Sequence, residues 1–346
     1  MKNSMESKKM GLGYLLELAT GHYKSKVLFV STNLKIFTIL SKQPKTLIEI
    51  AEELNIKMRP ASMLLNACVA LKLLEKKDSV YSNSLTAKQY LVEASPRYME
   101  PAFFKFDEHS YLLFDKLEEA ILRNSKQISI QDPQNPELLA SCMQIANRDD
   151  YRSFLSAMDP IAEWPAGVIA STFDFSRFRK LIDVGGGTGI YSIAIVRKWP
   201  NIEAMIFDLP YVCEIGERIM KEKGLFHRIK YHSGDFFKDD FPEGDLAFLS
   251  NIIHGYGPEK CDILLRRIYD SLPNGGGIII SDLILDEDGC GPETAVLLSL
   301  YFLLITEDGR NYTASEYGNM LRNAGFVDIR FFKSSAQTRF ITAIKP

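Results

Sequence analysis

Three aspartates stand at the ends of successive apolar runs that have the composition of β-strands. Asp183 ends "KLID" before a run of glycines, Asp208 ends "AMIFD", and Asp235 follows "RIKYHSG". In a parallel sheet the carboxyl ends of the strands meet at one edge, where such sheets bind nucleotides. We expect Asp208 to accept hydrogen bonds from both ribose hydroxyls and Asp235 to accept one from an adenine amino group, with Phe236 packing on the ring.

The loop after Asp183, "VGGGTG", contains more glycine than a simple turn requires. Its glycines occupy four of five positions: Gly185, Gly186, Gly187 and Gly189. A G-x-G-x-x-G dinucleotide motif would need a further glycine where Ser192 stands. Asp183 would also repel a pyrophosphate, and the loop contains no lysine or arginine to offset that repulsion. The loop therefore favours a cationic cofactor without phosphate, S-adenosylmethionine, and disfavours an NAD-dependent oxidoreductase.

His254 follows the apolar run "DLAFLS" by four residues, which predicts a place near the cofactor edge. Methyl transfer from a sulfonium chiefly needs alignment, which can contribute roughly 7 to 11 kcal/mol. It also needs an electron-rich acceptor. A phenol with a pKa of about 10 is mostly protonated at neutral pH, and an imidazole can remove that proton. We therefore interpret His254 as a general base, although a lone histidine is otherwise more often a core residue.

The segment 166–346 alternates strand-like and helix-like runs. This predicts an α/β fold with a Rossmann-like, doubly wound and mostly parallel sheet. The last two runs, "VDIRFF" and "RFITAIK", have no crossover helix between them, so one strand at that edge should be antiparallel. Pro258 is expected to begin one helix, and Thr313 with Glu316 forms a capping box for another that ends at Gly325.

The segment 1–100 is mainly helical and has a winged-helix pattern. Thr46 and Glu49 have capping-box spacing, a second helix is predicted over 59–74, and "SVYSN" resembles a wing. The second helix offers few polar side chains for DNA, so subunit contact is the favoured interpretation. The segment 101–165 is predicted to be a helical linker that contributes to a pocket. Its stripe Tyr151, Phe154 and Met158 suits either core packing or a pocket wall.

The composition of the chain limits the classes of partner and ligand that it is expected to bind. A net charge of −3 and a pI near 6.0 give no global attraction to nucleic acid or anionic lipid. The five cysteines form no C-x-x-C pair and the five histidines have no metal-ligand spacing, so we expect no disulfide framework and no metal. No secretory signal and no apolar run of about 20 residues is evident. A cytoplasmic protein is expected, without a nucleic-acid or membrane partner.

Several longer motifs resemble the class I O-methyltransferases that include plant phenolic, acetylserotonin and bacterial tailoring enzymes. These motifs are "LIDVGGGTG", "FDLP", "GDFFKDDFPEGDLAFLSNIIHGY", "LLRRIYDSLPNGGGIIISD" and "GRNYTASEYGNMLRNAGF". The resemblance spans nearly the whole chain. It implies S-adenosylmethionine as cofactor, a small aromatic acceptor, and a homodimer formed through the N-terminal domain.

The resemblance also implies roles for individual residues. It makes His254 the general base, oriented by Asp282, and it puts Tyr256 where the family usually has a Trp near the adenine. The cofactor-binding residues it implies, together with those inferred above, are Asp183, Gly185, Gly187, Asp208, Leu209, Asp235, Phe236, Ser250 and Tyr256. The acceptor pocket would include Phe154 and Met158.

Two positions depart from the family's pattern. Gly255 stands where the family has an Asp after the histidine, and Asn311 stands where plant members have a second acid. C- and N-methyltransferases of the same fold therefore remain alternatives. So does a winged-helix regulator that binds S-adenosylmethionine without transferring the methyl group.

Overall fold

The computed structural model describes residues 11–99, 103, 106–127, 148–333 and 338–346, with side chains described from 158 onward in the helix that begins at 148. The chain forms two compact units, Met1–Glu108 and His109–Pro346. No described helix has the length and apolarity needed to cross a membrane. The finer division into segments 1–100, 101–165 and 166–346 stays a prediction.

The first unit consists of short helices and a small three-stranded sheet. Its elements are α1 (Leu12–Ala19), α2 (Gly21–Asn33), α3 (Ile36–Lys42), β1 (Lys45–Thr46), α4 (Leu47–Glu53), α5 (Met58–Ala70), β2 (Leu74–Lys77), β3 (Val80–Asn83) and α6 (Leu85–Tyr90). The capping box of Thr46 and Glu49 is confirmed at the start of α4. The helix predicted over 59–74 ends earlier, at Ala70, because Leu74 begins the hairpin of β2 and β3.

The second unit is built around a seven-stranded sheet of order β6-β5-β4-β7-β8-β10-β9. The parallel strands are β4 (Lys180–Val184), β5 (Glu203–Asp208), β6 (Ile229–Ser233), β7 (Leu246–Ser250) and β8 (Gly277–Leu283). The antiparallel strand is β10 (Thr338–Ile344), which lies between β8 and β9 (Val327–Lys333). The predicted antiparallel strand is thus next to the edge of the sheet, and β9 is outermost.

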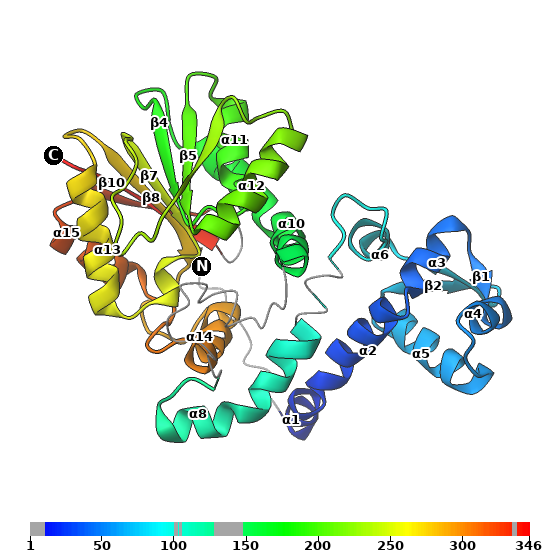
Figure 1. The fold of residues 1–346 in the computed structure, drawn as a ribbon. Helices are drawn as coiled ribbons and strands as arrows, with labels where there is room; N and C mark the ends of the chain where they lie inside the picture. Colours follow the sequence, from blue (N-terminus) through cyan, green and yellow to red (C-terminus); the bar gives the residue numbers. More distant parts are fainter. Residues whose placement is uncertain (1–10, 100–102, 104–105, 128–147, 334–337) are drawn as a thin grey trace, which may run out of the picture. The chain divides into compact units, whose positions relative to one another are not determined.

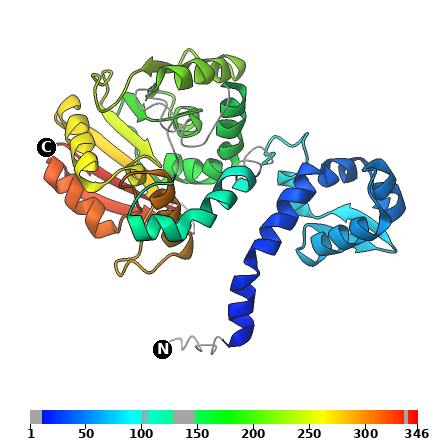
Figure 2. The ribbon, with the colours of Figure 1, turned by 60° about the horizontal axis from the view of Figure 1, so that its bottom comes forward.

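Helices cover both faces of this sheet (Figures 1 and 2). One face packs against α10 (Arg148–Thr172), α11 (Ile190–Lys198) and α12 (Pro210–Glu222), and the other against α13 (Pro258–Ser271) and α15 (Ala314–Ala324). Alternate residues of one strand serve the two cores: Leu246 and Phe248 enter the first, and Ala247 and Leu249 the second. This period of two is the strand geometry that the apolar runs predicted.

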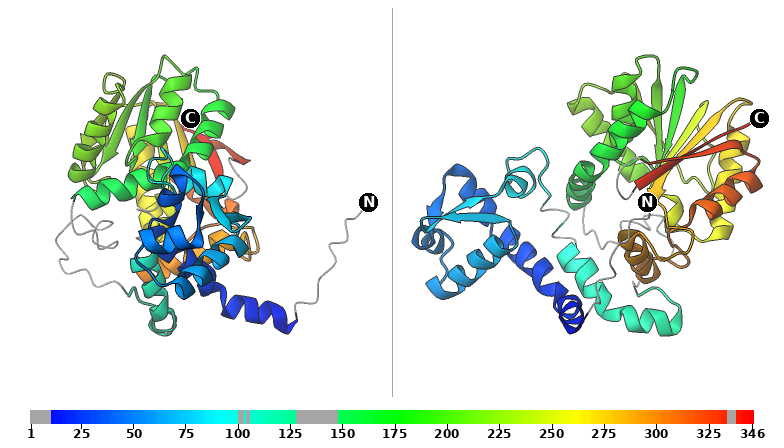
Figure 3. Two further views of the ribbon diagram at one scale, coloured as in Figure 1. Left: turned by 90° about the vertical axis from the view of Figure 1, so that its right-hand side faces the viewer. Right: turned by 180° about the vertical axis from the view of Figure 1, so that it is seen from behind.

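Helix α14 (Glu293–Ile305) packs beside α8 (Leu117–Arg123) in a smaller apolar cluster below the sheet as seen in Figure 1. The right-hand view of Figure 3 shows the sheet and the helices on its two faces from behind. The helix boundaries predicted from sequence are confirmed here: Pro258 is the first residue of α13, and the Thr313–Glu316 capping box and Gly325 bound α15.

Candidate active site

The glycine loop joins β4 to α11 at the carboxyl end of the sheet. Gly185, Gly187 and Gly189 have φ angles of +68°, +55° and +73°, a region that residues with a Cβ rarely occupy. A Cβ at Gly185 would also stand 2.4 Å from Ile252 Cδ1. The loop thus needs glycine for backbone conformation and for close approach, as expected of a cradle for a ligand.

Asp183 lies beneath this loop rather than on its rim. The residue is only 1% exposed, and Oδ2 accepts a 2.6 Å hydrogen bond from the Ser192 hydroxyl. Burial raises the pKa of Asp183 to about 7, against the lowering effect of the Ser192 hydrogen bond. The expected electrostatic contribution of Asp183 therefore acts through the loop, and its carboxylate does not border open space. Ser192 stands where a dinucleotide motif would have its third glycine. Its hydroxyl holds the Asp183 carboxylate.

Asp208 is half-buried at the end of β5 and holds the loop from the side. Oδ2 accepts a 2.9 Å hydrogen bond from the Gly187 backbone N–H, and Oδ1 accepts a 2.8 Å bond from that of Leu209. Burial raises the pKa of Asp208 to about 6. Each carboxylate oxygen can accept a further hydrogen bond, so the arrangement fits the ribose-binding role predicted from sequence.

Asp235 and Phe236 follow β6, which ends at Ser233. Asp235 Oδ1 caps the Phe237 N–H at 2.9 Å and its Oδ2 pairs with Lys238 Nζ at 2.8 Å. The Phe236 ring comes within 4.0 Å of the position that a Cβ on Gly185 would occupy. A flat ligand over the loop would therefore meet an aromatic ring there.

Tyr256 contributes a second aromatic ring beside this one. Its ring lies edge-on to the rings of Phe236 and Phe237, with centroids 6.1 and 5.0 Å away. Ser250, at the end of β7, is half-buried, and its Oγ accepts a 3.2 Å hydrogen bond from Asn251 Nδ2. Phe236 follows β6, and Ser250 and Tyr256 lie at or after the end of β7, so all three are on the carboxyl side of the parallel strands.

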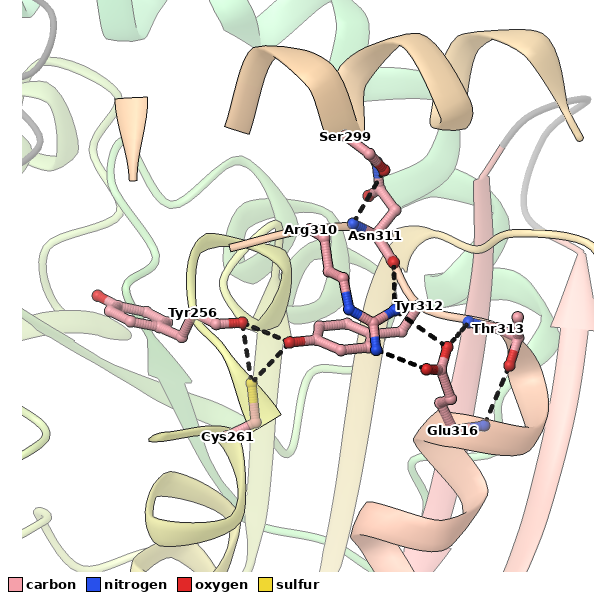
Figure 4. Close-up of polar contacts among 8 residues, drawn as sticks. All are labelled: Tyr256, Cys261, Ser299, Arg310, Asn311, Tyr312, Thr313 and Glu316. Carbon is pink, nitrogen blue, oxygen red and sulfur yellow. Dashed lines mark hydrogen bonds and ion pairs between the residues drawn. The ribbon is translucent and has the colours of Figure 1, made fainter. Parts of the chain in front are cut away.

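Tyr256 is held by the segment that precedes α15 (Figure 4). The Tyr312 hydroxyl donates a 2.6 Å hydrogen bond to the Tyr256 carbonyl, and the Arg310 guanidinium lies 4.3 Å from the centre of the Tyr312 ring. Arg310 pairs with Glu316 at 2.6 Å, and Glu316 also accepts a 2.8 Å hydrogen bond from the Thr313 N–H. A capping box, a cation–π contact and an ion pair thereby fix the position of Tyr256.

His254 and Asp282 form the close pair that the sequence predicted. His254 is 8% exposed, and its Nδ1 lies 2.6 Å from Asp282 Oδ1. The approach departs from ideal hydrogen-bond geometry, so we describe it as a close electrostatic contact. It leaves Nε2 as the ring nitrogen able to accept a proton from a ligand.

Asp282 is itself held by a residue that sequence reasoning missed. Its Oδ2 accepts a 2.9 Å hydrogen bond from the hydroxyl of Tyr317, and its Oδ1 accepts one of the same length from the Leu283 N–H. Both Asp282 and Tyr317 are fully buried. Burial raises the pKa of Tyr317 well above its usual range, so the phenol remains a donor. Helical spacing from the capping box puts Tyr317 and Leu321 on the inward face of α15, which was the available signal.

Helix α14 contributes an aromatic side chain, Phe302, that lies next to His254. The Phe302 ring centroid lies 4.4 Å from that of His254, with 35° between the planes. Asn311 is fully buried, and its Nδ2 donates a 2.7 Å hydrogen bond to the Ala295 carbonyl on the same helix. Asn311, which the resemblance matched to an acid of plant members, therefore fastens α14, and among the described residues Asp282 is the acid in contact with the histidine.

The acceptor-pocket residues predicted from sequence lie on α10. The side chain of Phe154 lies outside the described residues, and Met158 is half-buried. The next residue, Asp159, was not predicted: its Oδ1 accepts a 2.5 Å hydrogen bond from the hydroxyl of Thr188 in the glycine loop. No recurring motif marks Asp159, because it precedes the sheet and reaches the loop only through tertiary packing.

Comparisons with known proteins agree with this geometry. Residues 116–327 match the model of an O-methyltransferase domain, and residues 16–93 match that of an O-methyltransferase dimerisation domain. Acetylserotonin O-methyltransferase of Bos taurus is 34% identical over 92% of this chain and 94% of its own length. The 3-hydroxy-5-methyl-1-naphthoate 3-O-methyltransferase of Streptomyces sahachiroi is 34% identical over 91% of this chain and 90% of its own length.

Among solved structures, human N-acetylserotonin methyltransferase in complex with S-adenosylmethionine superposes with a TM-score of 0.87 and 29% identity, covering 100% of this chain and 99% of that one. A glycine cradle at the carboxyl end of a parallel sheet, an acid at the end of the next strand and a histidine–aspartate pair beside it thus occur in a chain that matches this group over both of its units. The chain belongs to the S-adenosylmethionine-dependent O-methyltransferase family.

Proposed function

We propose that this protein transfers a methyl group from S-adenosylmethionine to a hydroxyl of a small, mostly apolar aromatic molecule, with His254 as the general base. The observation that carries this proposal is the 2.6 Å contact between His254 Nδ1 and Asp282 Oδ1. A carboxylate on that side favours the tautomer with its proton on Nδ1 and leaves a lone pair on Nε2.

The chain is proposed to do two things: to remove the proton of the acceptor hydroxyl and to align that hydroxyl with the methyl group of the cofactor. When bound, the cofactor supplies an electrophilic methyl group on a sulfonium. His254 Nε2 accepts the hydroxyl proton as the acceptor oxygen forms its bond to that methyl carbon and the sulfur–carbon bond breaks. Asp282 stabilises the imidazolium that results, and Tyr317 holds Asp282 in place. General-base assistance of this kind typically contributes about 10²- to 10⁴-fold in rate.

The cofactor site proposed here uses the residues predicted from sequence. Gly185 and Gly187 provide a backbone without side chains, and Asp208, next to Leu209, offers acceptors to the ribose. The remaining residues assigned to the site are Asp183, Asp235, Phe236, Ser250 and Tyr256. Asp183 acts from beneath the loop, since it is only 1% exposed.

The acceptor is proposed to be apolar and flat because an aromatic ring, that of Phe302, lies next to His254. The segments assigned to the pocket also present apolar side chains, since Met158 on α10 is half-buried and Leu297 on α14 is exposed. Two relatives are named for aromatic acceptors, acetylserotonin and a hydroxynaphthoate. That supports the same substrate class for this chain.

The protein is further proposed to be a homodimer assembled through its N-terminal unit. Residues 16–93 match an O-methyltransferase dimerisation domain. Helix α1 has no buried residue in the single chain, and Leu12, Leu15 and Leu16 are 72%, 60% and 56% exposed. Burial of such leucines against a second copy would be favourable at about 25 cal/mol per Å².

The decisive experiment incubates the protein with methyl-labelled S-adenosylmethionine and a panel of small phenols, including N-acetylserotonin and hydroxynaphthoates, and follows the products by mass spectrometry. The expected result is label on a phenolic oxygen. Label on carbon or nitrogen would assign the chain to the other methyltransferase classes. Cofactor binding without transfer to any acceptor, together with salt-dependent DNA binding in a gel-shift assay, would instead indicate a regulator.

A further inference from the structure

We propose that Asp159 binds the α-ammonium group of the cofactor's methionine moiety and that Thr188 orients its carboxylate for this purpose. The inference rests on the proposed function and adds a cofactor contact that does not come from the strand ends or from the glycine loop itself. Asp159 lies on α10, the helix that also supplies Met158, and its side chain is half-buried.

The contact between Asp159 and the loop is short and specific. Thr188 lies between Gly187 and Gly189, and its hydroxyl donates a 2.5 Å hydrogen bond to Asp159 Oδ1. On the other side, the Tyr231 hydroxyl donates a 3.0 Å bond to the Gly187 carbonyl. A loop fastened at successive residues presents Asp159 to its ligand in a fixed position, which lowers the entropy lost on binding.

Three carboxylates of the described residues approach the loop, and Asp159 is the one with an oxygen that neither a described hydrogen bond nor the ribose assignment uses. Asp183 is 1% exposed and is bonded to Ser192. Asp208 receives the N–H groups of Gly187 and Leu209, and its remaining capacity is assigned to the ribose. Among the described residues, no hydrogen bond involves Asp159 Oδ2.

The three aspartates at the loop favour a cationic ligand. Burial raises the pKa values of Asp159, Asp183 and Asp208 to about 6, 7 and 6. Lys223 lowers the pKa of Asp159 and Glu163 raises it, so the one described basic neighbour is opposed by another acid. A cationic group beside Asp159 would stabilise its ionised form.

The ammonium is a better partner for Asp159 than the sulfonium is. An ammonium has three N–H donors, and N–H donors to a carboxylate make strong charge-assisted hydrogen bonds. A sulfonium has no donor, and the transferable methyl group must face the acceptor and His254. The carboxylate of Asp159 is thus suited to the α-ammonium group, which takes no part in methyl transfer. Thr188 holds its Oδ1, and Oδ2 accepts from the ammonium.

The test compares the affinity for two ligands by isothermal titration calorimetry at a pH near 8, where the acids are ionised. The ligands are S-adenosylmethionine and the analogue that lacks its α-amino group. In D159N the amide retains an oxygen for the Thr188 hydroxyl but loses the charge. We expect D159N to lower the affinity for S-adenosylmethionine by about 10- to 100-fold and to leave the affinity for the analogue within about twofold of wild type.

Glu163→Gln is the matched control, since it removes the same charge one helical turn further along α10, at an exposed position. It should change neither affinity. Thr188→Val, which keeps the residue's shape and leaves the carboxylate in place, should cause a smaller loss that is again confined to S-adenosylmethionine. Thermal unfolding shows whether each variant is folded, and T188V provides the readout if D159N is not.

Two outcomes would overturn the assignment of Asp159. An equal loss of affinity for both ligands in D159N would mean that the residue only supports the loop, and an unchanged affinity for both would mean that it does not participate. Failure of the wild-type protein to bind S-adenosylmethionine is a separate result. It would overturn the proposed function, and the role of Asp159 with it.

Discussion

Gly186 lies directly over the carboxylate of Asp183, so that a Cβ built at position 186 would stand 2.6 Å from Asp183 Cγ. The glycine therefore makes room for a buried acid, whereas its neighbours Gly185, Gly187 and Gly189 are required by their positive φ angles. The glycine loop and the acid beneath it therefore form one structural unit.

Gly186→Ala should consequently strain the loop. Because Asp183 is fully enclosed and bonded to Ser192, it cannot easily move aside, and overpacking of this kind costs about 1–3 kcal/mol. The expected result is a lower denaturation midpoint and weaker S-adenosylmethionine binding. Gly255→Ala is the matched control, because a Cβ there meets no heavy atom within 4 Å. Equal stability of G186A and G255A in urea titrations would contradict the prediction.

His254→Ala should abolish most of the turnover. Loss of the base is expected to reduce kcat by about 10²- to 10⁴-fold while S-adenosylmethionine affinity stays near that of the wild type. Methyl transfer to the best phenol of the panel measures the rate, and calorimetry measures the affinity. His227→Ala, at an exposed site before β6, serves as control and should retain full activity. Full activity of H254A would point to an acceptor that needs no base.

Tyr317→Phe should weaken the support of Asp282 without removing the base. The buried carboxylate loses the 2.9 Å hydrogen bond from Tyr317, which costs about 1–3 kcal/mol of unfolding free energy. We expect a lower kcat, but a smaller loss than in H254A, with little change in cofactor affinity. Tyr269→Phe also removes one phenolic hydroxyl but leaves Asp282 untouched. If the two variants had the same kcat, Tyr317 would have no positioning role.

The acids at the glycine loop predict how stability depends on pH. The pKa values of Asp159, Asp183 and Asp208 lie at about 6, 7 and 6, above the ordinary value near 3.9. Between the ordinary pKa and the raised pKa values, the folded protein binds more protons than the unfolded chain does. The free energy of unfolding therefore falls as the pH rises through this range. Glu163 and Lys223 also face Asp159 and oppose one another.

Thermal unfolding at about pH 5 and about pH 8, with and without S-adenosylmethionine, measures this effect. The contribution of the three aspartates should make the ligand-free protein less stable at the higher pH. Binding of the cationic cofactor should offset the repulsion, so the rise in Tm that it causes should be larger near pH 8. A rise that is larger near pH 5 would contradict the prediction.

Leu15→Glu should weaken the dimer. It introduces a charge on helix α1, where Leu15 is 60% exposed in the single chain. Light scattering during size-exclusion chromatography should show a shift from dimer toward monomer. Leu122→Glu, at a leucine on α8 that is 77% exposed and belongs to the second unit, is the control. An unchanged dimer in L15E would show that α1 does not form the interface.

The sequence predicted the elements of this site better than it predicted their connections. Asp208 and His254 could be assigned because Asp208 ends an apolar strand and His254 follows one, and period-two burial fixes where such residues lie. Asp282 lies inside β8 and was assigned only from the resemblance to the family. The alternating sheet and both capping boxes were recognisable for the same local reason. Asp183 is different, since residue spacing did not reveal that it lies under Gly186.

The contacts that could not be predicted join segments far apart in the chain. Asp159 reaches Thr188 across 29 residues, and Tyr317 reaches Asp282 across 35. Such pairs depend on how helices pack on the sheet, which involves no recurring local pattern. The order of β10 and β9 at the edge is a further example, because turn chemistry shows that two strands are adjacent but not which of them is outermost.

The difference in burial between the acid beside His254 and the outer side of α14 has a practical consequence for redesign. Asp282 and Tyr317 sit wholly inside the interior, whereas Leu297, 49% exposed, belongs to a helix that is joined to the rest through Asn311. Under the proposed function, libraries varied on the exposed side of α14 are expected to sample new acceptors while the proposed base and its acid stay unchanged. Phe302 should be excluded from such libraries, because its ring centroid lies 4.4 Å from that of the His254 imidazole.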